Sequence, residues 1–113
     1  MKTSYWKLQK NSDNKEIMQE AAALIRTGEV VSFPTETVYG LGADGLNPEA
    51  VAKIFAAKGR PNDNPLILHI AKKEAIEQLT TGLNANAKKL MEHFWPGPLT
   101  LIVNKSAIVP DAV

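Results

Sequence analysis

The chain of 113 residues contains no cysteine. This absence excludes disulfide bonds, thiolate nucleophiles and zinc sites with cysteine ligands. No run of apolar residues approaches the roughly 20 that a membrane-spanning helix requires. The first lysines are also not followed by the apolar run of a secretory signal. We therefore predict a cytoplasmic protein with no membrane partner.

The chain also has no excess of charge of one sign. Its 13 Lys and Arg residues face 12 Asp and Glu residues, which leaves a formal net charge of +1. This balance does not call for a polyanionic partner, so any basic site must be local. Apolar residues make up 44% and charged residues 22% of the chain, a composition typical of folded globular domains.

The first half of the chain predicts a helix, a short strand, a loop and a second helix. Asp13 and Glu16 have the spacing of a capping box, and Gly28 is a natural helix end. The β-branched run 30–33 predicts a buried strand, and everything from Pro34 to Asn47 is expected to be loop. Asn47 and Pro48 predict an N-cap and first helical residue for a helix that ends at Lys58 and Gly59.

The second half predicts two further strands separated by helices. The expected order is a strand at 66–70, a short helix at 73–79, a helix at 85–94, a break at 95–98 and a strand at 100–103. Alternating strands and helices indicate an α/β fold in which helices cover a sheet. Three strands make a thin sheet with unprotected edges, so we expect residues 1–113 to be the amino-terminal part of one truncated domain.

A loop rich in hydroxyl groups and glycine follows the first predicted strand. It reads PTETVYGLG from Pro34 to Gly42, and ligands of open α/β sheets bind beyond the carboxyl ends of strands. Thr35, Thr37 and Tyr39 could donate and accept hydrogen bonds to a small polar substrate. The alternative is a tight turn whose threonines bond to local backbone groups.

Two cations flank Gly59 at the end of the second predicted helix. Lys58 offers a point charge and Arg60 a bidentate fork, which suits a polyphosphate. The alternative is that both simply complement the negative end of the helix dipole. Neither GxxxxGK[ST] nor GxGxxG occurs in the chain.

Histidines and aromatics have simpler interpretations. His69 shares a strand face with Ile67, where a lone histidine is usually a hydrogen-bonded core or rim residue. Only one other histidine, His93, is present, so we expect no metal site. Trp95 should end a helix and enter the core, and the stripe of Leu90, Met91 and Phe94 should also be core.

Three segments together resemble one family. PTETVYGLG, KGRPNDNPLILHI and FWPGPLTLIV, in this order and at this spacing, resemble the amino-terminal half of the threonylcarbamoyl-AMP synthases, or YrdC-like proteins. The resemblance covers roughly residues 21–113. It implies a twisted mixed open sheet, parallel and antiparallel, with flanking helices around a large cavity. The family's Ser-x-Asn motif lies further downstream and is not in this chain, so we expect the piece alone to be inactive.

The resemblance implies an enzyme, a nucleotidyltransferase that joins ATP, L-threonine and bicarbonate into threonylcarbamoyl-adenylate and pyrophosphate. A partner transferase complex would then modify tRNA. Lys58 and Arg60 would be the catalytic residues and, with Asn62, would bind ATP. Thr35, His69 and Tyr39 would contact threonine. Mg²⁺ would bridge the phosphates, with no protein metal site.

Two other classes compete with the enzyme. The first is a module that binds double-stranded RNA or tRNA without nucleotidyl transfer, but its broad basic surface is not evident in a chain with dispersed lysines. The second is a larger carbamoyl-transfer protein of metal-centre maturation, which shares these motifs and carries extra domains. The start at Met1 favours the synthase over that second class.

Overall fold

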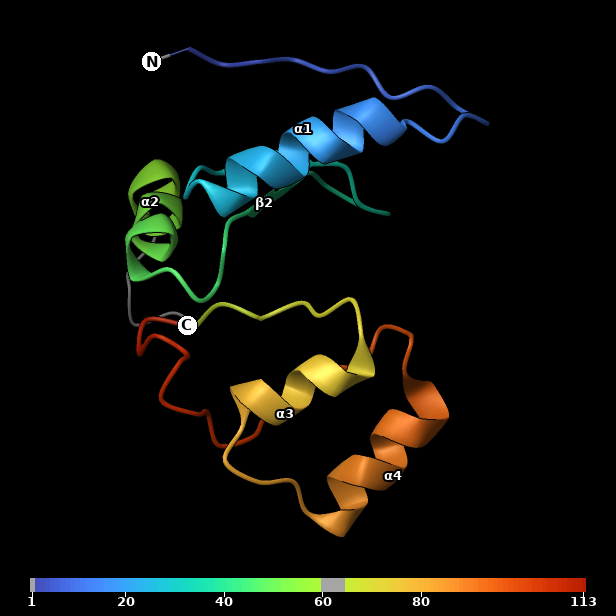
Figure 1. Cartoon of the computed structure of the whole chain (residues 1–113), viewed down its shortest axis with the longest axis vertical. Coiled ribbons are helices and arrows are strands. Elements are labelled where there is room, and N and C mark those ends of the chain that lie inside the picture. Colours follow the sequence, from blue (N-terminus) through green and yellow to red (C-terminus); the bar gives the residue numbers. More distant parts are fainter. Residues whose placement is uncertain (1, 60–64) are drawn as a thin grey trace.

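The computed structural model describes residues 2–59 and 65–113 of the chain. In chain order, its elements are α1 (Lys15–Arg26), β1 (Val31–Phe33), β2 (Gly40–Gly42), α2 (Pro48–Lys58), the 3₁₀ turn η1 (Lys73–Ala75), α3 (Ile76–Leu79) and α4 (Ala85–Phe94). Figure 1 shows α1, the strands and α2 in one half, and α3, α4 and the carboxyl-terminal segment in the other. The α/β class predicted from the sequence is confirmed.

Helix α1 forms where the apolar spacing predicts it, but the predicted capping box is wrong. The N-cap is Asn14, in the left-handed conformation with φ 51° and without a side-chain bond to the helix. Its amide instead holds the preceding turn, accepting from Gln9 N at 2.8 Å and donating to Gln9 O at 3.1 Å. Asparagine tolerates positive φ, so the N-cap falls at Asn14, while the Asp13 side chain still accepts from Lys15 N at 3.2 Å.

The sheet in the described residues is a two-stranded antiparallel pair, β1 with β2, in which Phe33 lies opposite Gly40 and Val31 opposite Gly42. The expectation of a loop from Pro34 to Asn47 is therefore wrong at Gly40–Gly42. The sequence of β2 does not predict a strand, because two of its three residues are glycines and glycine has low strand propensity. They are needed because the Phe33 ring lies over both: an added Cβ would stand 2.9 Å from a ring carbon at either position.

Helix α2 follows the prediction at both ends. The Asn47 side chain accepts from the backbone of Glu49 at 3.0 Å and Ala50 at 3.3 Å. Pro48 occupies the first turn, and Gly59 ends the helix with φ 62°. The helix carries one side of the core, whose buried members there are Ala50, Val51, Ile54 and Phe55.

In the described part of the chain, the segments 66–70 and 100–103 are not assigned as strands, so the prediction of two further strands is wrong for this structure. Side chains alternate along the first segment, with Leu66, Leu68 and Ile70 half-buried and Ile67 exposed. No backbone hydrogen bond joins either segment to a neighbouring strand within the described residues. A strand assignment requires a partner, which sequence alternation cannot supply.

An isolated bridge and side-chain hydrogen bonds hold the carboxyl-terminal segment against the end of α3. Thr80 pairs with Lys105 in an isolated antiparallel bridge. The buried Thr80 hydroxyl donates to Asn104 O at 2.7 Å. Other buried side chains of this half are Ile76, Ala87, Met91 and Val109.

The predicted helix 85–94 and its break are confirmed, but the predicted core stripe is only partly right. Met91 is buried, whereas Leu90 is 39% and Phe94 57% exposed. Trp95 is half-buried, and its indole Nε1 donates to Leu99 O at 2.9 Å. The Trp95–Pro96 peptide bond is cis.

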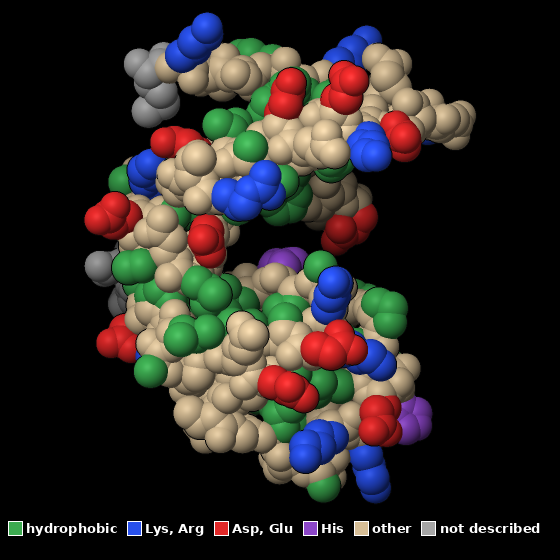
Figure 2. Space-filling view, in the orientation of Figure 1, with side chains coloured by type: hydrophobic (Ala, Val, Ile, Leu, Met, Phe, Trp, Pro, Cys, Tyr) green, Lys and Arg blue, Asp and Glu red, His purple; other side chains and the backbone are tan. Residues whose placement is uncertain are grey.

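The chain is less compact than a finished domain of its length. Its radius of gyration is 15.5 Å, against about 13 Å for a compact domain of this size. Figure 2 shows a deep hollow between the two halves. No helix of the described residues is long and apolar enough to cross a membrane.

Candidate functional site

Lys58 lies at the carboxyl-terminal turn of α2, directly before the left-handed Gly59. Its side chain is exposed and makes no hydrogen bond or ion pair with any described residue. The ammonium group is thus available to a ligand, although its place in the last turn also fits the helix-dipole alternative. The other two predicted phosphate-binding residues, Arg60 and Asn62, lie outside the described residues.

Thr35 and Tyr39 stand in the exposed loop between β1 and β2. The Thr35 hydroxyl donates to Val38 O and accepts from Thr37 N, so the turn alternative describes its contacts in this structure. A hydroxyl has a second acceptor lone pair, which remains for a substrate. Tyr39 is 76% exposed. The loop therefore presents polar groups to its surroundings rather than to a core.

His69 is exposed on the segment 66–70, so of the two positions considered for it, core and rim, the structure excludes the core. Its Nδ1 lies 3.1 Å from Ile67 O. A carbonyl only accepts, so this contact is a hydrogen bond when Nδ1 carries a proton, and in that neutral tautomer Nε2 is an acceptor. An acceptor nitrogen at this position could receive a hydrogen bond from an ammonium or hydroxyl group.

Within residues 2–59 and 65–113, no hydrogen bond or ion pair joins Lys58, Thr35, Tyr39 and His69 to one another. Two other contacts connect the segments that carry them. The Leu68 side chain packs on Gly45, where an added Cβ would stand 2.1 Å from Leu68 Cδ2. This contact holds the His69 segment against the loop that follows β2.

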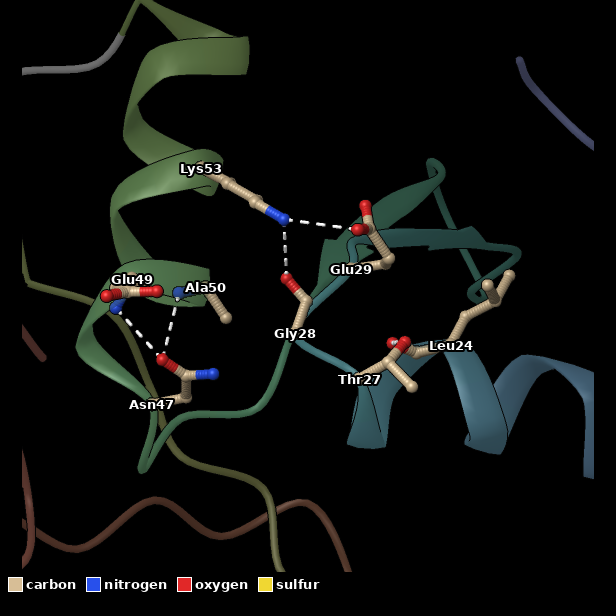
Figure 3. Close-up of polar contacts among 8 residues, drawn as sticks. All are labelled: Leu24, Thr27, Gly28, Glu29, Asn47, Glu49, Ala50 and Lys53. Atoms are coloured by element: carbon tan, nitrogen blue, oxygen red, sulfur yellow. Dashed lines mark hydrogen bonds and ion pairs between the residues drawn. The ribbon is translucent and has the colours of Figure 1, made fainter. Parts of the chain in front are cut away.

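The second connection is Lys53, a residue that the sequence did not single out. Figure 3 shows its ammonium reaching from α2 to Gly28 O at 2.9 Å and to Glu29 Oε1 at 3.3 Å. A lysine on a helix surface carries no pattern that foretells a partner 25 residues away. The contact links α2 to Gly28 and Glu29, the residues that lead into β1.

Neither a cluster of metal ligands nor a shifted pKa marks a second candidate site in the described residues. No group of three or more His, Asp or Glu side chains that could hold a metal occurs in the described residues. A hydrogen bond from Lys105, and then its positive charge, lowers the pKa of Asp111 below its usual value. This pair lies in the carboxyl-terminal segment and includes none of the predicted site residues.

A cavity of about 400 Å³ opens beside α4, lined by Ala87, Leu90, Ile102 and Asn104 among others. None of the predicted site residues lines it. Its walls are apolar side chains and asparagine amides, without a charged or catalytic group. The cavity therefore does not coincide with the chemistry that the motifs indicate.

Comparison with known proteins places the motifs in a family. The Sua5/YciO/YrdC family model, described as Telomere recombination, matches residues 23–113. The threonylcarbamoyl-AMP synthase of Pyrococcus abyssi is 56% identical over 93 residues, covering 82% of this chain and 27% of that protein. The Bacillus subtilis threonylcarbamoyl-AMP synthase is 55% identical, covering 100% of this chain and 33% of that protein.

Solved structures agree. The crystal structure of Pyrococcus abyssi Sua5 complexed with L-threonine matches with a TM-score of 0.79 and 55% identity, over 84% of this chain and 28% of that one. A doubly substituted form of the same protein gives a TM-score of 0.80. The chain thus spans about a third or less of the length of these relatives, and it belongs to the Sua5/YciO/YrdC family.

Proposed function

We propose that this chain supplies the amino-terminal part of an L-threonylcarbamoyladenylate synthase, a nucleotidyltransferase acting on ATP, L-threonine and bicarbonate. The observation that carries the proposal is the 55–56% identity to two proteins named threonylcarbamoyl-AMP synthase. The three motifs lie inside the matched region. A Sua5 structure with L-threonine bound supports the amino-acid substrate.

The proposed reaction has two steps. The threonine amine attacks bicarbonate carbon and water is lost, which leaves a carbamate. A carbamate oxygen then attacks the α-phosphorus of ATP, the bond between that phosphorus and the bridging oxygen breaks, and pyrophosphate leaves with the electron pair. Such transfers depend on positioning and on neutralising charge at the phosphate oxygens.

In this scheme Lys58 and Arg60 supply that neutralisation. Lys58 has the exposure and the free ammonium group that the role requires. A point charge and a planar fork on either side of one glycine can contact different phosphate oxygens. Asn62, four residues beyond Lys58, would add contacts to the nucleotide.

Thr35, Tyr39 and His69 would bind threonine. All three are exposed polar side chains rather than parts of the core. The Nε2 acceptor of His69 suits the ammonium or hydroxyl of the amino acid, and the Thr35 oxygen retains acceptor capacity.

Mg²⁺ would accompany ATP as a counter-ion of its phosphates. The described residues hold no cluster of metal ligands. The neutralisation of phosphate charge that we assign to the protein therefore rests on Lys58 and Arg60. The product would pass to a threonylcarbamoyl transferase complex that modifies tRNA, and both steps would take place in the cytoplasm.

We further propose that residues 1–113 are one part of a larger domain and have little activity alone. Within the residues that the structure describes, no strand pairs with the segments 66–70 and 100–103, and Ile102 is 100% exposed. Exposed edges of this kind are normally covered in finished folds. The remaining residues of a chain as long as those of the relatives would cover these edges and supply the downstream Ser-x-Asn motif.

RNA binding receives no comparable support. On the face seen in Figure 2, Lys and Arg side chains are interspersed with Asp and Glu. Affinity for RNA phosphates requires several cations on one surface. An RNA contact would therefore have to come from elsewhere on the protein.

The test uses a hybrid in which this chain replaces the matching segment of the Bacillus subtilis relative. Pyrophosphate release is measured with ATP, threonine and bicarbonate, and again with each omitted in turn. Release should require all three. Pyrophosphate release that depends on neither threonine nor bicarbonate would refute the proposed function.

A further inference from the structure

Lys53 makes the side-chain hydrogen bonds that join α2 to the segment 28–42 in the described part of the chain. Figure 3 shows its side chain extended from α2 toward the turn that ends α1. Lys58 lies on the same helix, and the turn leads directly into β1. Both parts of the proposed site therefore emerge from the two elements that this one side chain connects.

The turn at Gly28 has a fixed geometry. Glu29 N donates to Leu24 O at 3.0 Å and Gly28 N to Ile25 O at 3.1 Å, which is a Schellman motif. Gly28 occupies the left-handed region with φ 89° and is buried. The direction in which the chain enters β1 is set by this turn.

The carbonyl of Gly28 is the more important of the two Lys53 partners. A buried carbonyl needs a donor, and an ammonium group near a helix carboxyl terminus is favoured by the helix dipole. The contact with Glu29 is longer, and both charged side chains are about half exposed. Exposed ion pairs contribute little, so the carbonyl contact should dominate.

Asn47 supports the same point from the start of α2. An added Cβ on Gly28 would stand 3.2 Å from Asn47 Nδ2, so the cap residue of α2 abuts the turn. Lys53 and Asn47 thus contact one turn from positions six residues apart on the helix. Five residues separate Lys53 from Lys58, about 7.5 Å along the helix axis.

We propose that Lys53 is a positioning residue: by holding Gly28 O, it fixes the placement of α2 relative to β1 and hence of Lys58 relative to the Thr35 loop. It contacts no substrate. The inference rests on the proposed function for the roles of Lys58 and Thr35, and on the contacts above for the placement itself.

The first arm of the test measures the placement in the 113-residue chain. Because the chain has no cysteine, single cysteines at Ser32 in β1 and Ala57 in α2 can carry spin labels specifically. Lys53→Met keeps the stem and removes the donor, and should broaden the inter-label distance distribution. Lys53→Arg should restore a narrow distribution, and Glu29→Gln should leave it unchanged.

The second arm uses the hybrid synthase. Lys53→Met should lower kcat/KM by about ten- to a hundredfold, because small misplacements of reacting groups have effects of that size. Lys53→Arg should recover most of the loss, and Glu29→Gln should retain full activity. A lower melting temperature with unchanged kcat/KM per folded molecule, or an unchanged distance distribution, would overturn the proposal. If the unsubstituted hybrid is inactive, the proposed function fails and the distance measurement alone decides the placement.

Discussion

The Phe33 ring lies so close over Gly40 that a Cβ on Gly40 would stand 2.9 Å from Phe33 Cζ. Gly40→Ala should push the half-exposed ring from its rotamer and destabilise the chain by about 0.5–1.5 kcal/mol. Gly82→Ala is the matched control, since nothing lies within 4 Å of its added Cβ. Urea unfolding of both variants gives the comparison.

The same contact predicts a rescue. Phe33→Leu shortens the side chain that Gly40→Ala would meet, so the alanine should cost less in the Phe33→Leu background than in the natural chain. Equal costs in the two backgrounds would show that the ring contact does not set the glycine requirement.

Lys58→Ala and Arg60→Ala should separate activity from stability in the hybrid synthase. A cation at a helix end contributes about 0.3–1 kcal/mol to stability, whereas loss of a group that stabilises transition-state charge lowers kcat by about 10²–10³. Lys88→Ala, which removes an exposed cation from α4, is the control. Thermal melting and pyrophosphate release give the two readouts. Variants that melt but keep full turnover per folded molecule would favour the helix-dipole interpretation.

Thr35→Ala should weaken threonine binding more than ATP binding in the hybrid, because its hydroxyl is assigned to the amino-acid pocket. Thr37→Ala is the control, since the hydroxyl of Thr37 makes no hydrogen bond within the described residues. Calorimetric titration of each ligand measures both affinities. If both variants lose the same affinity for threonine, the assignment is wrong. It is also wrong if Thr35→Ala lowers the affinity for ATP as much as the affinity for threonine.

Ile102→Lys should block completion of the domain without harming the chain itself. Its side chain is 100% exposed and lines the cavity beside α4. The remaining part of the Bacillus subtilis relative, supplied as a second polypeptide, should stabilise the natural chain against urea and restore pyrophosphate release. Tyr5→Lys, at a site 91% exposed, should behave like the natural chain.

Two outcomes would contradict this prediction. Complementation of Ile102→Lys to the same extent as the natural chain would place the interface elsewhere. Equal stability and turnover of the 113-residue chain alone and of the hybrid would show the chain to be self-sufficient.

Local signals in the sequence predicted local structure well. Helix 85–94 and both ends of α2 depend on caps and apolar spacing within a few residues, and they formed as expected. Strand β2 was missed because Gly40 and Gly42 have low strand propensity, and their cause, the Phe33 ring, lies on another strand. The segments 66–70 and 100–103 failed as strands because pairing depends on partners beyond local sequence.

The candidate site shows the same division. The three motifs predicted the family, which the comparisons confirmed. The turn alternative for the Thr35 loop anticipated that the Thr35 hydroxyl bonds to its own loop, but no pattern predicted that Lys53 reaches Gly28 O. The Lys53 contact depends on how the backbone folds around a residue with an ordinary local pattern. The substrate roles of Lys58, Arg60, Asn62, Thr35, Tyr39 and His69 remain predictions.

The proposed reaction is tested most directly by tracing isotope labels from threonine and bicarbonate into the adenylate. The hybrid synthase is incubated with ATP, threonine labelled with nitrogen-15 and bicarbonate labelled with carbon-13, and the adenylate is identified by mass spectrometry. The proposed reaction predicts a single adduct that contains AMP and both labels, formed together with pyrophosphate and greatly reduced by Lys58→Ala. An adenylate of threonine without the bicarbonate carbon, or AMP release that does not depend on threonine, would contradict it.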